Sequence, residues 1–194
     1  SEGQQYFSAM VCAANFAWAN RQLITHWVRE SFEKVFNRSA QDLGMSILYD
    51  VAHNIAKIEQ HQINEKILKL CVHRKGATRS FGPGHRDLPD KYRSVGQPVL
   101  IPGDMGTGSF ILCGMARSME ESFGSACHGA GRVMSRSEAD RSAKGRNIAN
   151  ELEEKGVLVM AESNATLREE IPAAYKDVGE VVTVVEKAGL ARRI

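Results

Sequence analysis

Cysteine is scarce in this sequence, with four residues among 194, and these four lie far apart without a CxxC pair. That spacing argues against a disulfide framework and predicts reduced thiols in a cytoplasmic protein. Long apolar runs are also missing, since no segment approaches the roughly 20 uncharged apolar residues that a membrane-spanning helix needs. The first residues lack the basic-then-apolar order of a secretory signal. We therefore expect no membrane association.

An excess of charge of one sign is missing as well, because 25 Lys and Arg residues nearly balance 23 Asp and Glu residues. The net charge of +2 does not by itself indicate nucleic-acid binding. The basic residues nevertheless gather in two segments, as contacts to a phosphate backbone require. Solvated surfaces are the alternative, which we favour for Lys144 and Arg146. The two segments contain Arg74, Lys75, Arg79, Arg86, Lys91 and Arg93, and Arg132, Arg136, Arg141, Lys144 and Arg146.

The remaining pattern predicts one α+β domain over residues 1–194, with a mixed or antiparallel sheet core, flanking helices and a glycine-rich catalytic centre. At 43% hydrophobic residues the chain is long enough for a well-formed core, and it shows neither an internal repeat nor a clean linker. Periodicity and capping signals place the expected elements. We expect helices at 6–36, from 135 onward, at 147–155 and at 177–189, strands at 46–53, 66–73, 98–103, 109–116 and 157–163, and a loop at 80–95.

The most informative segment is CHGAGR at 127–132, where small residues flank a histidine and an arginine follows two glycines. Glycines let the backbone approach an anion closely, and an arginine can hold phosphate oxygens with two parallel hydrogen bonds. The histidine His128 could then be a base, a metal ligand or a covalent nucleophile. A glycine-rich turn with a surface histidine is the alternative for this segment taken alone.

Three upstream segments have the same irregular, polar and glycine-containing character. They are DVAHN at 50–54, HRKGATR at 73–79 and GQPVLIPGDMGTGS at 96–109. The GDMGTGS stretch is not a Walker loop, because no Lys-Ser or Lys-Thr pair follows its last glycine. A plain hairpin is an equally good interpretation of it, and a lone histidine beside an asparagine is weak evidence for a metal.

Together the motifs DVAHNIAKIE, VHRKGATRSFGPG, GQPVLIPGDMGTGSFIL and CHGAGRVMSR, in this order and spacing, resemble the RtcB family of RNA ligases. The resemblance extends from 3–7 to 188–190 and so covers essentially the whole chain. It implies an RtcB-like fold. Compared with the family, the chain corresponds to a C-terminal catalytic portion, so we expect the N-terminal part and the short final strand, which ends in lysine and glycine, to be absent.

The resemblance also implies roles for individual residues. It makes His128 the catalytic nucleophile that becomes linked to GMP, and His53 a manganese ligand whose partner ligands lie in the absent N-terminal part. Arg132, Arg136, Lys75 and Arg79 are our expected contacts to RNA or phosphate. The expected nucleotide-binding residues are His53, Asn54, Pro102, Gly103, Asp104, Met105, Ser109, His128, Gly129, Ala130, Gly131 and Tyr175.

The implied function is a GTP- and Mn²⁺-dependent RNA ligase for tRNA splicing or RNA repair, acting on tRNA halves or other broken RNA ends. It joins a 3′-phosphate or 2′,3′-cyclic phosphate end to a 5′-hydroxyl end, and an activating protein is a further expected partner. Two alternatives stay open at this point. One is a metal-dependent phosphohydrolase with a histidine phosphate acceptor, and the other is a non-catalytic RNA-binding module.

Overall fold

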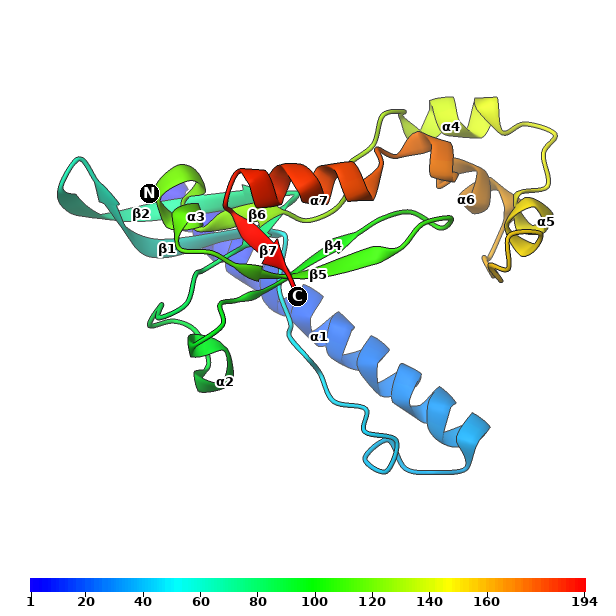
Figure 1. The fold of residues 1–194 in the computed structure, drawn as a ribbon, viewed down its shortest axis with the longest axis horizontal. Coiled ribbons are helices and arrows are strands. Elements are labelled where there is room, and N and C mark those ends of the chain that lie inside the picture. The colour runs from blue at the N-terminus through cyan, green and yellow to red at the C-terminus, as the bar shows by residue number, and fades with distance from the viewer. The chain divides into compact units, whose positions relative to one another are not determined.

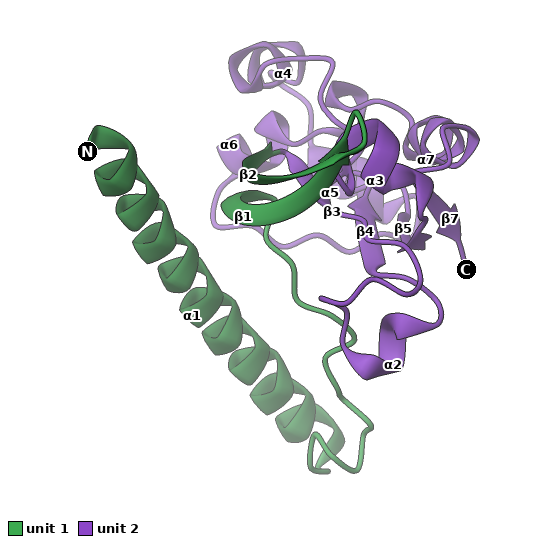
Figure 2. Ribbon diagram, turned by 90° about the vertical axis from the view of Figure 1, so that its left-hand side faces the viewer, with its two compact units in different colours: residues 1–75 green, residues 76–194 purple.

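A computed structural model describes all residues from 1 to 194, and the chain forms two compact units, residues 1–75 and 76–194 (Figures 1 and 2). The first unit contains α1 (Glu2–Phe36), β1 (Asn54–Ile63) and β2 (Lys66–Lys75). The second contains β3 (Ala77–Arg79), α2 (Asp90–Arg93), β4 (Pro98–Pro102), β5 (Ser109–Gly114), α3 (Arg117–Ser122), β6 (Ser125–Cys127), α4 (Arg136–Ser142), α5 (Ile148–Glu153), α6 (Asn164–Glu169), the 3₁₀ turn η1 (Pro172–Ala174), α7 (Val178–Lys187) and β7 (Ala191–Arg193). All strand pairs are antiparallel, as expected for an α+β protein.

The first helix forms as its periodicity predicts, and it ends at Asn37 in the left-handed conformation, with φ 51°. The helical spacing of its apolar residues also predicts a broad buried face, and this prediction is wrong, because Ala14 is the only buried residue of α1. Large apolar side chains such as Phe16 and Trp27 are 78% and 56% exposed. Periodicity reports which residues share a helix face, but burial also needs a neighbouring surface to cover that face.

The two strands of the first unit form a hairpin in which Asn54 pairs with Lys75 and Ile63 with Lys66. Its two turn residues, Asn64 and Glu65, both have positive φ, as a tight two-residue hairpin turn requires. The predicted strand at 66–73 is therefore confirmed. The predicted strand at 46–53 is wrong, because that segment is irregular and the strand begins at Asn54.

A buried ion pair fixes one face of this hairpin. The guanidinium of Arg74 donates to both carboxylate oxygens of Glu59, at 2.8 and 2.9 Å, and Nε2 of His61 lies 3.1 Å from the same carboxylate. All three side chains are buried. Removing either Arg74 or Glu59 would leave the other as a buried charge without compensation, so this pair joins the two strands of the hairpin.

The second unit contains a three-stranded sheet in the order β4-β5-β7 and a smaller pair, β3-β6. The strands predicted at 98–103 and 109–116 are confirmed as β4 and β5. Helix α7, which Asp177 caps as expected, lays the helically spaced Val178, Val182 and Val185 on this sheet. The resulting core consists of Val99, Ile101, Leu112, Ala126, Ala130, Val178, Val182, Val185 and Ala191.

A separate core holds α4, α5 and α6 together. The helix expected from residue 135 onward is confirmed as α4, and the hydroxyl of Ser135 caps it by accepting a hydrogen bond from the backbone N–H of Glu138. The strand predicted at 157–163 is wrong, since this segment has no partner strand and leaves Leu158 and Met160 84% and 99% exposed. The core consists of Ala139, Ala143, Ile148, Leu152, Leu167, Ile171 and Ala174.

Two further expectations concern the loop at 80–95 and the cysteines. The loop is mostly irregular, as predicted, and contains only the short helix α2. The four cysteines form no disulfide with one another. None of the helices combines the length and the apolar character needed to cross a bilayer.

Candidate active site

His128 directly follows β6, a strand that β3 fixes by pairing Ala77 with Cys127. The backbone N–H of His128 donates to the carbonyl of Gly76, at 3.3 Å, which extends the pairing by one residue. The imidazole therefore projects from backbone that is held on one side by a strand ladder. Burial raises the pKa of the neighbouring Cys127 thiol, so this thiol is protonated at neutral pH.

The glycine-rich run after His128 is held at both ends by backbone hydrogen bonds. The N–H of Ala130 donates to the carbonyl of Pro102, at 3.1 Å, and the N–H of Lys176 donates to the carbonyl of Gly131, at 3.0 Å. Gly131 has φ +79°, a left-handed conformation that side chains other than glycine rarely adopt. The run thus joins the end of β4 to the segment after η1.

The turn at 103–108 between β4 and β5 is built around Asp104. One carboxylate oxygen accepts from the N–H of Gly106, at 2.7 Å, and the other accepts from the hydroxyl of Thr107, at 2.9 Å. Such a carboxylate shapes its own turn. Met105 packs against the helical core, and Ser109 is exposed at the start of β5, opposite Pro102.

This turn lies against the segment that carries Tyr175. A Cβ atom added to Gly106 would lie 2.9 Å from Cγ of Pro172, and one added to Gly103 would lie 3.1 Å from Cγ1 of Val178. Three segments that are distant in sequence are therefore adjacent: the turn at 103–108, the run at 128–131 and the segment at 172–178. These segments contain most of the residues that the sequence predicts to bind a nucleotide.

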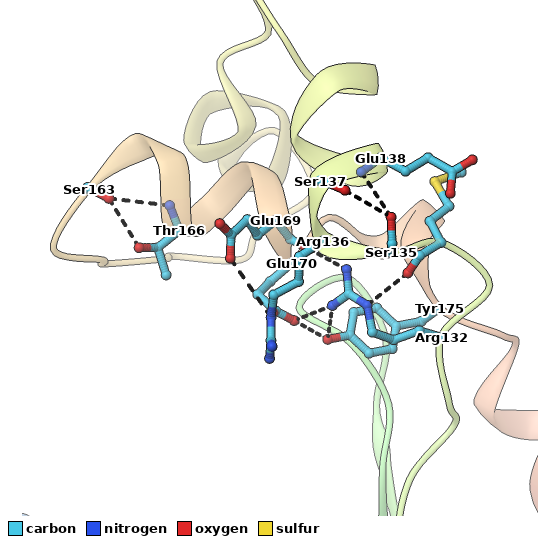
Figure 3. A network of polar contacts seen from close by, with 11 residues as sticks. Arg132, Ser135, Arg136, Ser137, Glu138, Ser163, Thr166, Glu169, Glu170 and Tyr175 are labelled. Atoms are coloured by element: carbon cyan, nitrogen blue, oxygen red, sulfur yellow. Dashed lines mark hydrogen bonds and ion pairs between the residues drawn. The ribbon is translucent and has the colours of Figure 1, made fainter.

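Arg132 and Tyr175 join two of these segments through side chains (Figure 3). Nη1 of Arg132 donates to the hydroxyl of Tyr175 and to Oε2 of Glu170, each at 2.9 Å. Its other nitrogens donate to the carbonyls of Met134, at 3.0 Å, and Glu169, at 2.6 Å. The guanidinium carbon also lies 4.8 Å from the centre of the Tyr175 ring, within cation–π range. Arg132 is thus engaged on every side chain nitrogen.

Glu170 is a centre of negative charge in this network. Burial by itself would raise the pKa of Glu170, but hydrogen bonds from Tyr175 and Arg136 and the charge of Arg132 outweigh it and hold the pKa below its usual range. Burial, followed by the hydrogen bond to Glu170, raises the pKa of Tyr175. Arg136 donates to Glu170 at 3.1 Å with a side chain that is 69% exposed. Sequence reasoning missed Glu170, because no motif marks the residues around it.

The remaining predicted site residues include three in the first unit. His53 precedes β1, and Asn54 pairs with Lys75 across the hairpin. Partial burial, then the charges of Lys75 and Arg21, lower the pKa of His53, which favours the neutral imidazole that a metal ligand needs. In the second unit, the guanidinium of Arg79 lies 4.9 Å from the centre of the Phe81 ring.

A complete metal site is not formed by this chain. No group of three or more His, Cys, Asp or Glu side chains is arranged to hold a metal ion. His53 therefore offers one donor, whereas Mn²⁺ needs several oxygen or nitrogen donors. The residues present do not fit a self-contained manganese centre.

Comparison with known proteins shows to which family the chain is related. The model of the family described as tRNA-splicing ligase RtcB matches residues 1–194. Relatives named tRNA-splicing ligase RtcB occur in Thermococcus kodakarensis, at 61% identity over 193 residues, and in Archaeoglobus fulgidus, at 58%. A relative from Pyrococcus abyssi is 60% identical. The matches cover 100% of this chain but only 40%, 40% and 21% of these three relatives. The chain belongs to the RtcB family.

Proposed function

We propose that this chain carries the nucleotidyl-transfer centre of a GTP-dependent RNA ligase, with His128 as the nucleophile. The supporting observation is the position of the run at 128–131, whose backbone bonds to Gly76, Pro102 and Lys176. This backbone is fixed beside a turn with exposed glycines, where a nucleotide phosphate can approach. Membership of a family whose members are named tRNA-splicing ligases supports the same reaction.

The proposed reaction has three steps. A neutral nitrogen of His128 attacks the α-phosphorus of GTP, forming a P–N bond as the P–O bond to pyrophosphate breaks. An oxygen of the RNA 3′-phosphate then attacks the same phosphorus, which breaks the P–N bond and transfers GMP to the RNA end. Finally the 5′-hydroxyl of the second RNA attacks the 3′-phosphate, and GMP leaves as the phosphodiester forms. The activation is needed because an unactivated phosphomonoester has a poor leaving group.

In this proposal, some of the remaining residues bind the nucleotide and others bind the RNA. The turn from Pro102 to Ser109 binds guanosine, and Asp104 contributes by shaping the turn, since its carboxylate is already hydrogen-bonded within it. Tyr175 is a further nucleotide contact in the second unit, and Asn54 is the proposed nucleotide contact of the first unit. Arg136, with its exposed side chain, Lys75 and Arg79 contact RNA phosphates, whereas Arg132 is held by the protein itself.

Cofactor and partners follow the same proposal. His53 supplies one ligand to Mn²⁺ in a protein that contains this chain and has the full length of its relatives, called the full-length protein below. The other ligands come from outside this chain, which has no complete set. The substrates are RNA ends left by cleavage, such as tRNA halves, and an activating protein is a further partner.

Intact-mass spectrometry of the full-length protein after incubation with GTP and Mn²⁺ tests the nucleophile. We expect a covalent GMP adduct that is labile in acid and stable in alkali, as a phosphoramidate is. His128→Ala should abolish it, whereas His26→Ala, which changes an exposed histidine of α1, should not. Full adduct in the His128→Ala protein would reject the assignment. An adduct that carries the γ-phosphate without the base would indicate the phosphohydrolase instead.

A further inference from the structure

The carboxylate of Glu170 accepts hydrogen bonds from three side chains that belong to two separate segments. The residue follows α6, and its carboxylate accepts from Nη1 of Arg132 at 2.9 Å, from Nε of Arg136 at 3.1 Å, and from the hydroxyl of Tyr175 (Figure 3). Arg132 and Arg136 follow the run at 128–131, and Tyr175 directly follows η1. One carboxylate therefore connects two of the segments that meet at the candidate active site.

The contacts specify an ionised carboxylate. Arg132 and Arg136 are cations, and only a carboxylate without a proton offers enough acceptor sites for three donors. The side chain of Glu170 is 29% exposed and that of Arg132 24%, so water screens this pair less than it screens a surface ion pair. The lowered pKa of Glu170 agrees with this ionised form.

The carboxylate also sets the orientation of Tyr175. Because the hydroxyl donates its proton to Glu170, its oxygen remains an acceptor for Arg132. The guanidinium of Arg132 can then lie over the aromatic ring of Tyr175 while it donates a hydrogen bond to the hydroxyl of that ring. Backbone pairing between Arg132 and Tyr175 and the bond from Lys176 to Gly131 continue the connection to the run that begins at His128.

We propose that Glu170 is a positioning residue for nucleotide binding, which holds Arg132 and Tyr175 in place beside the His128 run. This inference rests on the proposed function and adds a residue that no motif or resemblance assigns. Glu170 itself does not touch the reacting atoms; it acts through its two partners. The competing interpretation is that Glu170 occupies the arginines in place of an RNA phosphate and must be displaced by it.

The test compares Glu170→Gln, which keeps the size but removes the charge, with Glu169→Gln. Glu169 is the matched control because its bond to Arg132 comes from its backbone carbonyl, and its carboxylate only reaches exposed Arg136 at 3.8 Å. In the full-length protein we expect Glu170→Gln to raise the KM for GTP in adduct formation by about tenfold to a hundredfold, as loss of charged hydrogen bonds implies. The maximal rate should change much less. Glu169→Gln should leave both near the unsubstituted values.

Two measurements separate positioning from general loss of structure. Titration of ¹³C-labelled tyrosine by NMR, with the Tyr175 signal identified through Tyr175→Phe, should show a lower pKa of Tyr175 in Glu170→Gln. Glu170→Asp, which retains the charge, should recover part of the KM. A Glu170→Gln protein that forms adduct with an unchanged KM would overturn the inference, as would tighter binding of 3′-phosphate RNA, the sign of displacement. If the unsubstituted protein forms no adduct, the proposed function is wrong, whereas the tyrosine titration still decides whether Glu170 holds Tyr175.

Discussion

Gly103 provides the sharpest test of the proposed guanosine-binding turn. A Cβ atom at this position would lie 2.4 Å from the carbonyl oxygen of Gly108 and 3.1 Å from Cγ1 of Val178. Because the first neighbour is backbone, the turn must move by about 1 Å to restore an ordinary contact, a strain of about 1–3 kcal/mol for a well-packed site. A displacement of about 1 Å in a binding group can lower a reaction rate by about a hundredfold. We therefore expect Gly103→Ala to slow adduct formation by about 10- to 100-fold.

A glycine outside the proposed site offers a control for this prediction. A Cβ atom at Gly3, in α1, meets nothing within 4 Å, and the φ of Gly3 is not positive, so Gly3→Ala should be tolerated. The assay is the rate of GMP adduct formation at His128 in the full-length protein, measured by intact mass. Equal rates in the two variants would refute the argument that the packed turn positions the nucleotide.

Two further predictions address separate parts of the second unit. Ser109→Ala should weaken GTP use, because its exposed hydroxyl belongs to the proposed guanosine site, while ligation of RNA already carrying 3′-linked GMP should suffer much less; equal damage to both reactions would contradict this role. Asp177→Ala should destabilise the chain by about 1 kcal/mol, since the carboxylate caps α7 by accepting from the N–H of Glu180 at 2.8 Å. Asp177→Asn keeps an acceptor and should unfold at nearly the original temperature in a thermal melt.

Local signals predicted the helices better than the strands. Caps at Ser135 and Asp177 act over three residues and are visible in the sequence, so the starts of α4 and α7 could be predicted. The apolar segment at 157–163 has the composition of a strand, but Val157 and Val159 pack on the helical core and no second strand pairs with it. A strand exists only with its partner, and the sequence of one segment does not contain that information.

The candidate site shows the same division. His128 and the turn at 103–108 could be singled out because glycine, histidine and arginine stand together without hydrophobic periodicity. Their roles came from the resemblance to a family. The contacts of Arg132 could not be predicted, since its partner Glu170 lies in an ordinary Glu-Glu-Ile-Pro sequence, brought near by the fold. Sequence patterns therefore marked candidate residues, and long-range packing determined which charged side chains surround them.

The strand pairings also determine when the site can form during synthesis. Ala77 of β3 pairs with Cys127 of β6, which follows 50 residues later. One edge of β5 stays unpaired until β7 has been made, because Leu112 pairs with Arg193. Contacts between positions so distant in sequence form slowly, because closing a long flexible loop costs conformational entropy before any contact stabilises the closed loop. A growing chain on the ribosome therefore carries the run at 128–131 before it carries Lys176, whose N–H bonds to Gly131. The run acquires the last of its three backbone bonds only after translation has passed residue 176.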